Sequence, residues 1–167
     1  MKVIQKKICL LGEFSVGKTS LIRRFVEERF DENYLSTIGV HMSRKRLERA
    51  EYALDFFIWD LAGGEDFKVV GANYLRGSAG AIIVCDLTRK ETLTALPYYA
   101  GQIQSLNPQA ALVFVANKAD LVMERTVAHD AIIEAITAFG NTYLLTSAKT
   151  GQHVNEAFAA LADQMEK

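Results

Sequence analysis

Apolar runs of strand length constrain the fold of this 167-residue chain more than any other feature of its sequence. They cover residues 3–11, 54–59, 79–85, 111–116 and 142–146. A strand that is apolar at successive positions is buried on both faces, which is typical of parallel sheets covered by helices on both sides. A further run, residues 40–48, is mixed in polarity and indicates a strand at the edge of the sheet.

Amphipathic stripes fill the gaps between these runs. Apolar residues recur at intervals of three and four around residues 21–26, 93–103, 128–139 and 154–165. The order predicts an α/β fold with a six-stranded, mostly parallel sheet and helices on both faces. The second and third strands are separated by only a few residues, too few for a crossover, so they should form an antiparallel hairpin. We expect one domain over residues 1–167.

The composition argues against several other classes of protein. Lys and Arg total 19 and Asp and Glu total 20, a net charge of −1, so no bulk attraction to nucleic acid or anionic membrane is implied. Cys9 and Cys85 lie in apolar runs, which favours buried, reduced thiols over a disulfide or metal site. No run approaches the roughly 18 residues of a membrane span. Because position 2 is Lys and the last residues include no Cys, we expect a cytoplasmic chain without a membrane anchor.

A dense basic cluster lies on and just after the predicted edge strand. It consists of Arg44, Lys45, Arg46 and Arg49. Charged side chains on an edge strand oppose unwanted strand pairing, so we interpret the cluster as edge protection on a solvated face. The alternative is a surface for a partner.

Residues 12–19, Gly-Glu-Phe-Ser-Val-Gly-Lys-Thr, match the pattern G-x-x-x-x-G-K-[ST] between a predicted strand and a predicted helix. Backbone N–H groups in such a loop cradle phosphates at the positive end of the helix. Lys18 would reach the β- and γ-phosphates, and the Thr19 hydroxyl would bind Mg²⁺. The alternative is a glycine-rich turn that caps a helix, and the loop alone does not distinguish GTP from ATP. The predicted phosphate-contacting set is Gly12, Ser15, Val16, Gly17, Lys18, Thr19 and Ser20.

Two further motifs predict that the base is guanine. Asp120 ends the segment Asn117-Lys118-Ala119-Asp120, and its carboxylate can accept hydrogen bonds from N1–H and N2–H₂ of guanine, a donor pair that adenine lacks. Asn117 would brace the loop, and the stem of Lys118 would cover one face of the base. After the last strand, the segment Ser147-Ala148-Lys149 would place the Ala148 N–H against guanine O6.

With these motifs in order, the sequence resembles the small GTPases of the Ras superfamily, and the Rab branch in particular. Two more blocks match, Ser36-Thr37-Ile38-Gly39-Val40 and Trp59-Asp60-Leu61-Ala62-Gly63, and Tyr74-Leu75-Arg76-Gly77 is similar to the Tyr-Tyr-Arg-Gly of Rab proteins. The resemblance implies a P-loop NTPase domain with strand order 2-3-1-4-5-6 and strand 2 antiparallel.

The resemblance also implies roles for individual residues. Phe30 would pack edge-on against guanine, Thr37 would bind Mg²⁺ when a γ-phosphate is present, and Asp60 would hold Mg²⁺ through water. The Gly63 N–H would contact the γ-phosphate. The implied catalytic set is Lys18, Thr37, Gly63 and Gly64, and the implied metal set is Thr19, Thr37 and Asp60.

Two switch segments follow from the same resemblance: switch I at about residues 29–40 and switch II at about 61–76. They would order around GTP and Mg²⁺ and relax after hydrolysis. The implied partners are protein effectors, an exchange factor and a GTPase activator. Trp59 and Tyr74 resemble aromatic residues that Rab proteins present to effectors, although they could equally pack beneath switch II.

Three residues depart from the family pattern. Gly64 stands where the family has the glutamine that orients the attacking water. Phe14 stands where a small residue is usual, so its ring should crowd the γ-phosphate and the path of an activator's arginine. Glu13 adds a carboxylate that we expect to point to solvent. Glu65 is a weaker candidate to replace the glutamine.

The sequence therefore predicts a guanine-nucleotide switch that hydrolyses GTP slowly. The alternative is a scaffold that holds nucleotide without turnover. The guanine motifs argue against an ATP-using kinase.

Overall fold

The computed structural model describes residues 1–31 and 39–166. Within these residues the strands form one six-stranded sheet in the order β2-β3-β1-β4-β5-β6. Its strands are β1 (Lys2–Leu11), β2 (Val40–Glu48), β3 (Tyr52–Leu61), β4 (Gly80–Asp86), β5 (Ala111–Asn117) and β6 (Leu144–Leu145). Strand β2 is antiparallel to β3, and the other neighbouring pairs are parallel. The predicted strand order, the hairpin and the edge position of β2 are confirmed.

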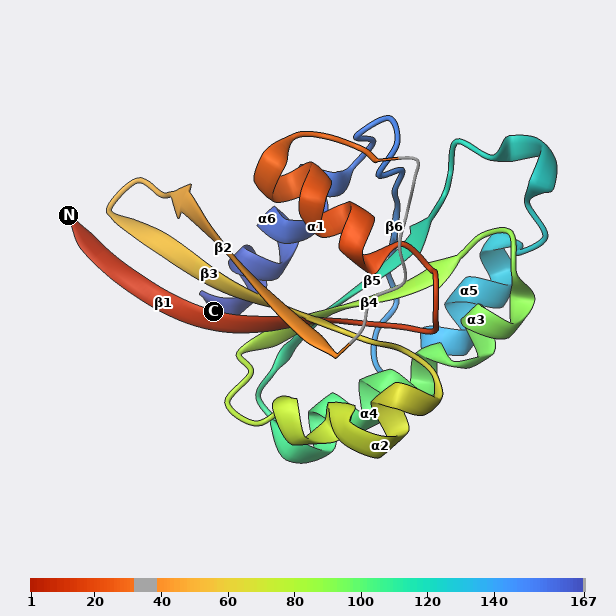
Figure 1. Cartoon of the computed structure of the whole chain (residues 1–167), viewed down its shortest axis with the longest axis horizontal. Helices are drawn as coiled ribbons and strands as arrows, with labels where there is room; N and C mark the ends of the chain where they lie inside the picture. The colour runs from red at the N-terminus through yellow and green to blue at the C-terminus, as the bar shows by residue number, and fades with distance from the viewer. Residues whose placement is uncertain (32–38, 167) are drawn as a thin grey trace.

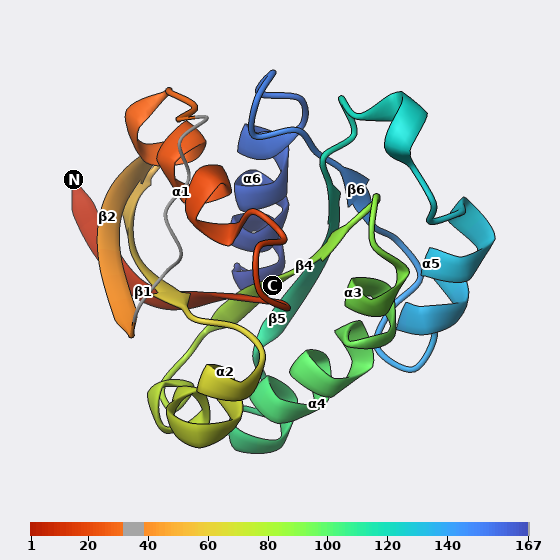
Figure 2. The same cartoon turned by 45° about the vertical axis from the view of Figure 1, so that its right-hand side comes forward.

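Helices cover both faces of the sheet (Figures 1 and 2). On one face lie α1 (Lys18–Glu27) and α6 (Val154–Met165), and the other face carries α2 (Glu65–Val70), α3 (Lys90–Thr94), α4 (Leu96–Leu106) and α5 (His129–Ile136). Two short 3₁₀ helices, η1 (Gly71–Tyr74) and η2 (Val122–Glu124), lie in the connections. The predicted α/β class is confirmed.

The central strands supply residues to two separate cores because their side chains alternate between the faces. In β1, Ile8 and Leu10 belong to the core beneath α1 and α6, whereas Cys9 and Leu11 belong to the core beneath α2 to α5. This alternation explains why the sequence of these strands is continuously apolar. Both Cys9 and Cys85 are buried free thiols, as predicted, and burial raises the pKa of Cys85 to about 12.

Two elements differ from the predicted pattern. The amphipathic stripe at residues 93–103 is divided between α3 and α4, and Pro97 lies in the first turn of α4, where its missing N–H is tolerated. The apolar run at residues 142–146 forms only the two-residue strand β6. Among the described residues, no helix is both long and apolar enough to cross a membrane.

Three arginines of the basic cluster on and just after β2 form ion pairs with carboxylates, although the sequence analysis interpreted the cluster as a solvated face. Arg44 and Arg46 both donate to Asp55 of β3, whose side chain is fully buried, at 2.5 and 2.6 Å. Arg49 pairs with Asp163 and Glu166 near the end of α6. These arginines therefore neutralise carboxylates of the same chain in addition to lining the sheet edge.

We expect the Phe158→Ala substitution to lower the free energy of unfolding by about 3–5 kcal/mol, because it removes a large core side chain. The rings of Phe25 and Phe158 stack in parallel, with centroids 3.9 Å apart, and join α1 to α6. Urea unfolding in saturating GDP measures the change. Val122→Ala is the control, since Val122 is 72% exposed and its loss should change stability by no more than about 0.5 kcal/mol. A loss below about 1 kcal/mol for Phe158→Ala would contradict the role of this stack.

Candidate nucleotide-binding site

The predicted site residues lie where strands of the sheet end. The loop at residues 12–17 follows β1, Asp60 lies near the end of β3, Asn117 ends β5, and the segment 146–149 follows β6. Parallel strands place their carboxyl ends at one edge of a sheet, and ligands of open α/β sheets bind there. The structure therefore brings these motifs together as the sequence predicted.

Two glycines of the loop are required by close approach of other groups. A Cβ on Gly12 would lie 2.5 Å from the carbonyl oxygen of Val84, and a Cβ on Gly17 would lie 2.3 Å from Nδ2 of Asn117. Both residues also have positive φ, +154° and +106°. A side chain at either position would displace the loop from the strands behind it.

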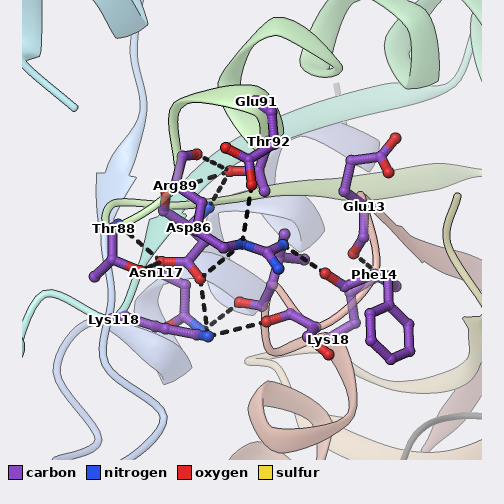
Figure 3. A network of polar contacts seen from close by, with 12 residues as sticks. Glu13, Phe14, Lys18, Asp86, Thr88, Arg89, Glu91, Thr92, Asn117 and Lys118 are labelled. Atoms are coloured by element: carbon purple, nitrogen blue, oxygen red, sulfur yellow. Dashed lines mark hydrogen bonds and ion pairs between the residues drawn. The ribbon is translucent and has the colours of Figure 1, made fainter. Parts of the chain in front are cut away.

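Three successive carbonyl oxygens of the loop accept hydrogen bonds from side chains near the ends of β4 and β5 (Figure 3). Arg89 donates to Phe14 O at 2.5 Å, Lys118 donates to Ser15 O at 2.9 Å, and Asn117 donates to Val16 O at 3.0 Å. With its carbonyl groups held in this way, the loop can present its N–H groups to an anion.

Asp86 anchors two of these donors. Its fully buried carboxylate lies 2.8 Å from Nζ of Lys118 and 3.5 Å from Nε of Arg89 (Figure 3). The backbone N–H and hydroxyl of Thr88 donate to its other oxygen. The sequence analysis missed Asp86 and Arg89, although an acidic residue at the end of a fully apolar strand was a signal that could have identified Asp86.

Lys18 is positioned for phosphate. Its Nζ donates to Gly12 O and Glu13 O, both at 2.9 Å, and the residue is only 6% exposed. Burial lowers the pKa of Lys18 to about 8, while the carboxylates of Asp60 and Glu13 oppose the shift. A bound phosphate would add negative charge beside the ammonium group and favour its charged form.

The residues predicted to hold Mg²⁺ fit that ion. The Thr19 hydroxyl donates to Asp60 Oδ2 at 2.5 Å, and Asp60 Oδ1 is buried without a hydrogen-bond partner among the described residues. Burial raises the pKa of Asp60. Mg²⁺ binds hydroxyl and phosphate oxygens and keeps several water ligands, so a water on the ion would donate to the buried Oδ1, as expected for contact through water. Thr37, the other predicted ligand, lies outside the described residues.

A cavity of about 330 Å³ lies where the base is expected. Predicted residues in its wall are Ser15, Gly17, Ser20, Phe30, Asn117, Lys118, Asp120, Ala148 and Lys149. Asp31 and Leu121 also line it, and the sequence analysis did not select them. Phe30 both lines this cavity and packs against the core beneath α1.

Hydrogen bonds join the two guanine motifs. The Ser147 hydroxyl donates to Asp120 Oδ1 at 2.8 Å, and the Thr146 hydroxyl donates to Asn117 Oδ1 at 3.0 Å. Arg24 of α1 donates to the carbonyl oxygen of Ala148 at 2.8 Å. The carboxylate of Asp120 is therefore oriented before any base contacts it.

The start of the predicted switch II touches the phosphate loop. A Cβ on Gly63 would lie 2.3 Å from Gly12 O, so only glycine allows this contact. The next residue, Gly64, has φ +65° and ψ −137°, a conformation that L-residues rarely adopt. Its N–H donates to the hydroxyl of Tyr99 on α4 at 3.0 Å.

The expectation that Glu13 points to solvent is wrong. The Tyr99 hydroxyl donates to Glu13 Oε1 at 3.1 Å, and Glu13 is only partly exposed. A buried phenol needs an acceptor, and the Glu13 carboxylate supplies it. Glu65 instead lies on the surface, 86% exposed, and pairs with Lys68.

Phe14, Trp59 and Tyr74 remain accessible. Phe14 is 50% exposed. The rings of Trp59 and Tyr74 lie 6.0 Å apart between centroids, and Nζ of Lys7 lies 4.6 Å from the Trp59 ring. Both aromatic residues are partly exposed and contact each other, and their presentation to effectors stays a prediction.

Comparison with known proteins agrees with this geometry. A family model described as Ras family matches residues 7–167. "Ras-related protein Rab-22A" of Homo sapiens is 36% identical over 163 residues, which cover 97% of this chain and 84% of that protein, and its Mus musculus counterpart matches equally. "Ras-related protein Rab-31" of Homo sapiens is 34% identical over 166 residues, or 99% of this chain and 85% of that protein.

The chain therefore belongs to the Ras family and is a Rab-like small GTPase. Proteins of this family are GTP-binding switches that bind GTP or GDP with Mg²⁺ and hydrolyse GTP. They act with effectors, exchange factors and activators.

We expect Asp120→Asn to exchange guanine for xanthine specificity. The substitution replaces a carboxylate oxygen with an N–H₂ donor, which mismatches N2–H₂ of guanine and suits the carbonyl group of xanthine. The affinity for GDP should fall at least about a hundredfold while that for xanthosine diphosphate rises. Competition titration with a fluorescent nucleotide measures both. Equal affinity of the unmutated protein for ATP and GTP would contradict guanine recognition by Asp120.

Proposed function

We propose that this chain is a Rab-like switch that binds GTP·Mg²⁺ or GDP through the cavity described above and hydrolyses GTP slowly. The observation that carries this proposal is the joining of the two guanine motifs to the phosphate loop. Lys118 belongs to the base motif and donates to Ser15 O, while Asp120 is oriented by Ser147. A site built in this way would hold both ends of a guanine nucleotide.

The proposed switching depends on the contact between Gly63 and the phosphate loop. In the family, this residue's N–H meets the γ-phosphate, and the close approach to Gly12 supports the same role here. Loss of the γ-phosphate would remove that contact and release switch II. Effectors would recognise the change at the partly exposed surface that includes Trp59 and Tyr74.

Slow hydrolysis follows from Gly64. Phosphoryl transfer needs mainly positioning and charge stabilisation from the protein, and a glycine supplies no side chain to position water. The alternative function, a nucleotide-bound scaffold without turnover, is favoured by the same observation. Measurement of turnover separates the two functions.

We expect single-turnover GTP hydrolysis by the unmutated protein at or below the order of 10⁻⁴ s⁻¹, the intrinsic scale of Ras. Gly64→Gln alone should raise the rate less than about tenfold, because the backbone at position 64 has φ +65° and must move to accept a side chain. Release of inorganic phosphate is the measurement. A rate near 10⁻² s⁻¹ without a partner would contradict slow hydrolysis, and no release from tightly bound GTP would establish the scaffold.

We expect an activator that supplies only an arginine to accelerate hydrolysis poorly while Phe14 is present. An arginine finger that reaches the γ-phosphate raises the hydrolysis rate about 10³–10⁵-fold. The accessible Phe14 ring should obstruct the path of that arginine. In the Gly64→Gln background, acceleration should appear once Phe14→Gly is added. Equal acceleration with and without Phe14→Gly would show that the ring does not obstruct the arginine.

A further inference from the structure

Three residues from separate segments meet at the start of switch II. Tyr99 is 1% exposed, and its hydroxyl accepts a hydrogen bond from the Gly64 N–H at 3.0 Å while donating to Glu13 Oε1 at 3.1 Å. Burial is the main cause that raises the pKa of Tyr99, so its hydroxyl keeps the proton that it donates. One oxygen of the Glu13 carboxylate is thereby fixed in place.

The other oxygen of this carboxylate lies beside Gly64. A Cβ built on Gly64 would be 3.6 Å from Glu13 Oε2, an ordinary van der Waals contact. The carboxylate therefore occupies space next to the point where a side chain at position 64 would leave the backbone. Gly64 supplies no side chain to this space, and the Glu13 carboxylate is a polar group that lies beside it.

Glu13 is also close to the phosphate end of the site. Its carbonyl oxygen accepts a hydrogen bond from Nζ of Lys18 at 2.9 Å, and its negative charge favours the protonated form of Lys18. Glu65, the weaker sequence candidate, is surface-exposed and pairs with Lys68. Of these two carboxylates, Glu13 alone is held against both switch II and the phosphate loop.

We propose that the Glu13 carboxylate, held by Tyr99, orients the attacking water in place of the glutamine that Gly64 replaces. This inference rests on the proposed function of GTP hydrolysis, and it assigns the slow rate that remains without the glutamine to Glu13. Glu13 Oε2 would accept a hydrogen bond from the water, and Tyr99 would limit the rotation of the carboxylate.

In this step the water oxygen forms a bond to the γ-phosphorus while the bond from that phosphorus to the β–γ bridging oxygen breaks. The electron pair of the broken bond remains on the GDP oxygen. The water proton passes to the released phosphate, so GTP and water give GDP and dihydrogen phosphate. The carboxylate is unchanged at the end of the step.

The test compares three variants in single-turnover GTP hydrolysis with saturating Mg²⁺. Glu13→Ala should lower the rate about tenfold, less than the roughly 10²–10⁴-fold typical of general acid–base groups, because the carboxylate orients the water and takes no proton. Glu13→Gln should stay within about threefold of the unmutated rate, since its amide oxygen can still accept the hydrogen bond from water. Tyr99→Phe should give an intermediate loss of about threefold or more, because the carboxylate then rotates freely.

Matched control variants and a measurement of nucleotide dissociation distinguish the positioning of water by Glu13 from structural damage to the site. Glu65→Ala and Tyr98→Phe alter an exposed carboxylate and the neighbouring tyrosine, and both should hydrolyse GTP at the unmutated rate. Dissociation of fluorescent GTP and GDP should change less than about twofold in the Glu13 variants, because the phosphate contacts come from the loop backbone and Lys18.

An unchanged or faster rate in Glu13→Ala would overturn the inference and leave the proposed function intact. A loss that Glu13→Gln fails to restore, with faster nucleotide dissociation in both variants, would also overturn it by showing a structural role. Tight GTP binding without hydrolysis by the unmutated protein would instead contradict the proposed turnover and the inference together.

Discussion

The hydrogen bonds that hold the carbonyl oxygens of Phe14, Ser15 and Val16 are the interaction on which the rest of the site depends. A loop can bind phosphate through its N–H groups only while its backbone keeps one conformation. Here the conformation is imposed from behind by donors at the ends of β4 and β5. The ligand need not organise the loop, so more of its binding energy remains available for affinity.

The buried Asp86 carboxylate makes this bracing possible. Arg89 and Lys118 each approach Asp86 and a loop carbonyl, so one negative charge orients two cations (Figure 3). A buried carboxylate is costly unless cations and hydrogen-bond donors surround it, and Thr88 completes that set. Since Lys118 also belongs to the guanine motif, the base and phosphate ends of the site share a support.

The sheet could be predicted from the sequence because the pattern of apolar residues in a strand depends on which of its faces are buried. Strands buried on both faces must be continuously apolar, and a connection of a few residues between β2 and β3 permits only a hairpin. The cavity residues were predicted because their motifs have fixed spacing. The division of the helical stripe before Pro97 was also visible in principle, since proline cannot continue a helix.

The direction of a long side chain could not be predicted in the same way. Whether Glu13 points to solvent depends on Tyr99, which is distant in sequence and contacts it only after α4 packs on the sheet. The positive φ of Gly64 is likewise a property of the folded loop. The sequence showed that a side chain was missing, but only the structure shows what lies in the neighbouring space.

The antiparallel register of β2 and β3 determines how the nucleotide state can be communicated. Val40, at the end of switch I, is paired with Leu61, at the start of switch II, and His41 is paired with Asp60. A slip of one residue would turn every side chain of β2 to the opposite face, so the register is strongly specified. The end of switch I and the start of switch II are thus paired directly, through Val40 and Leu61 of the β2–β3 ladder. A partner that docked at this pair would contact the ends of both proposed switch segments at once.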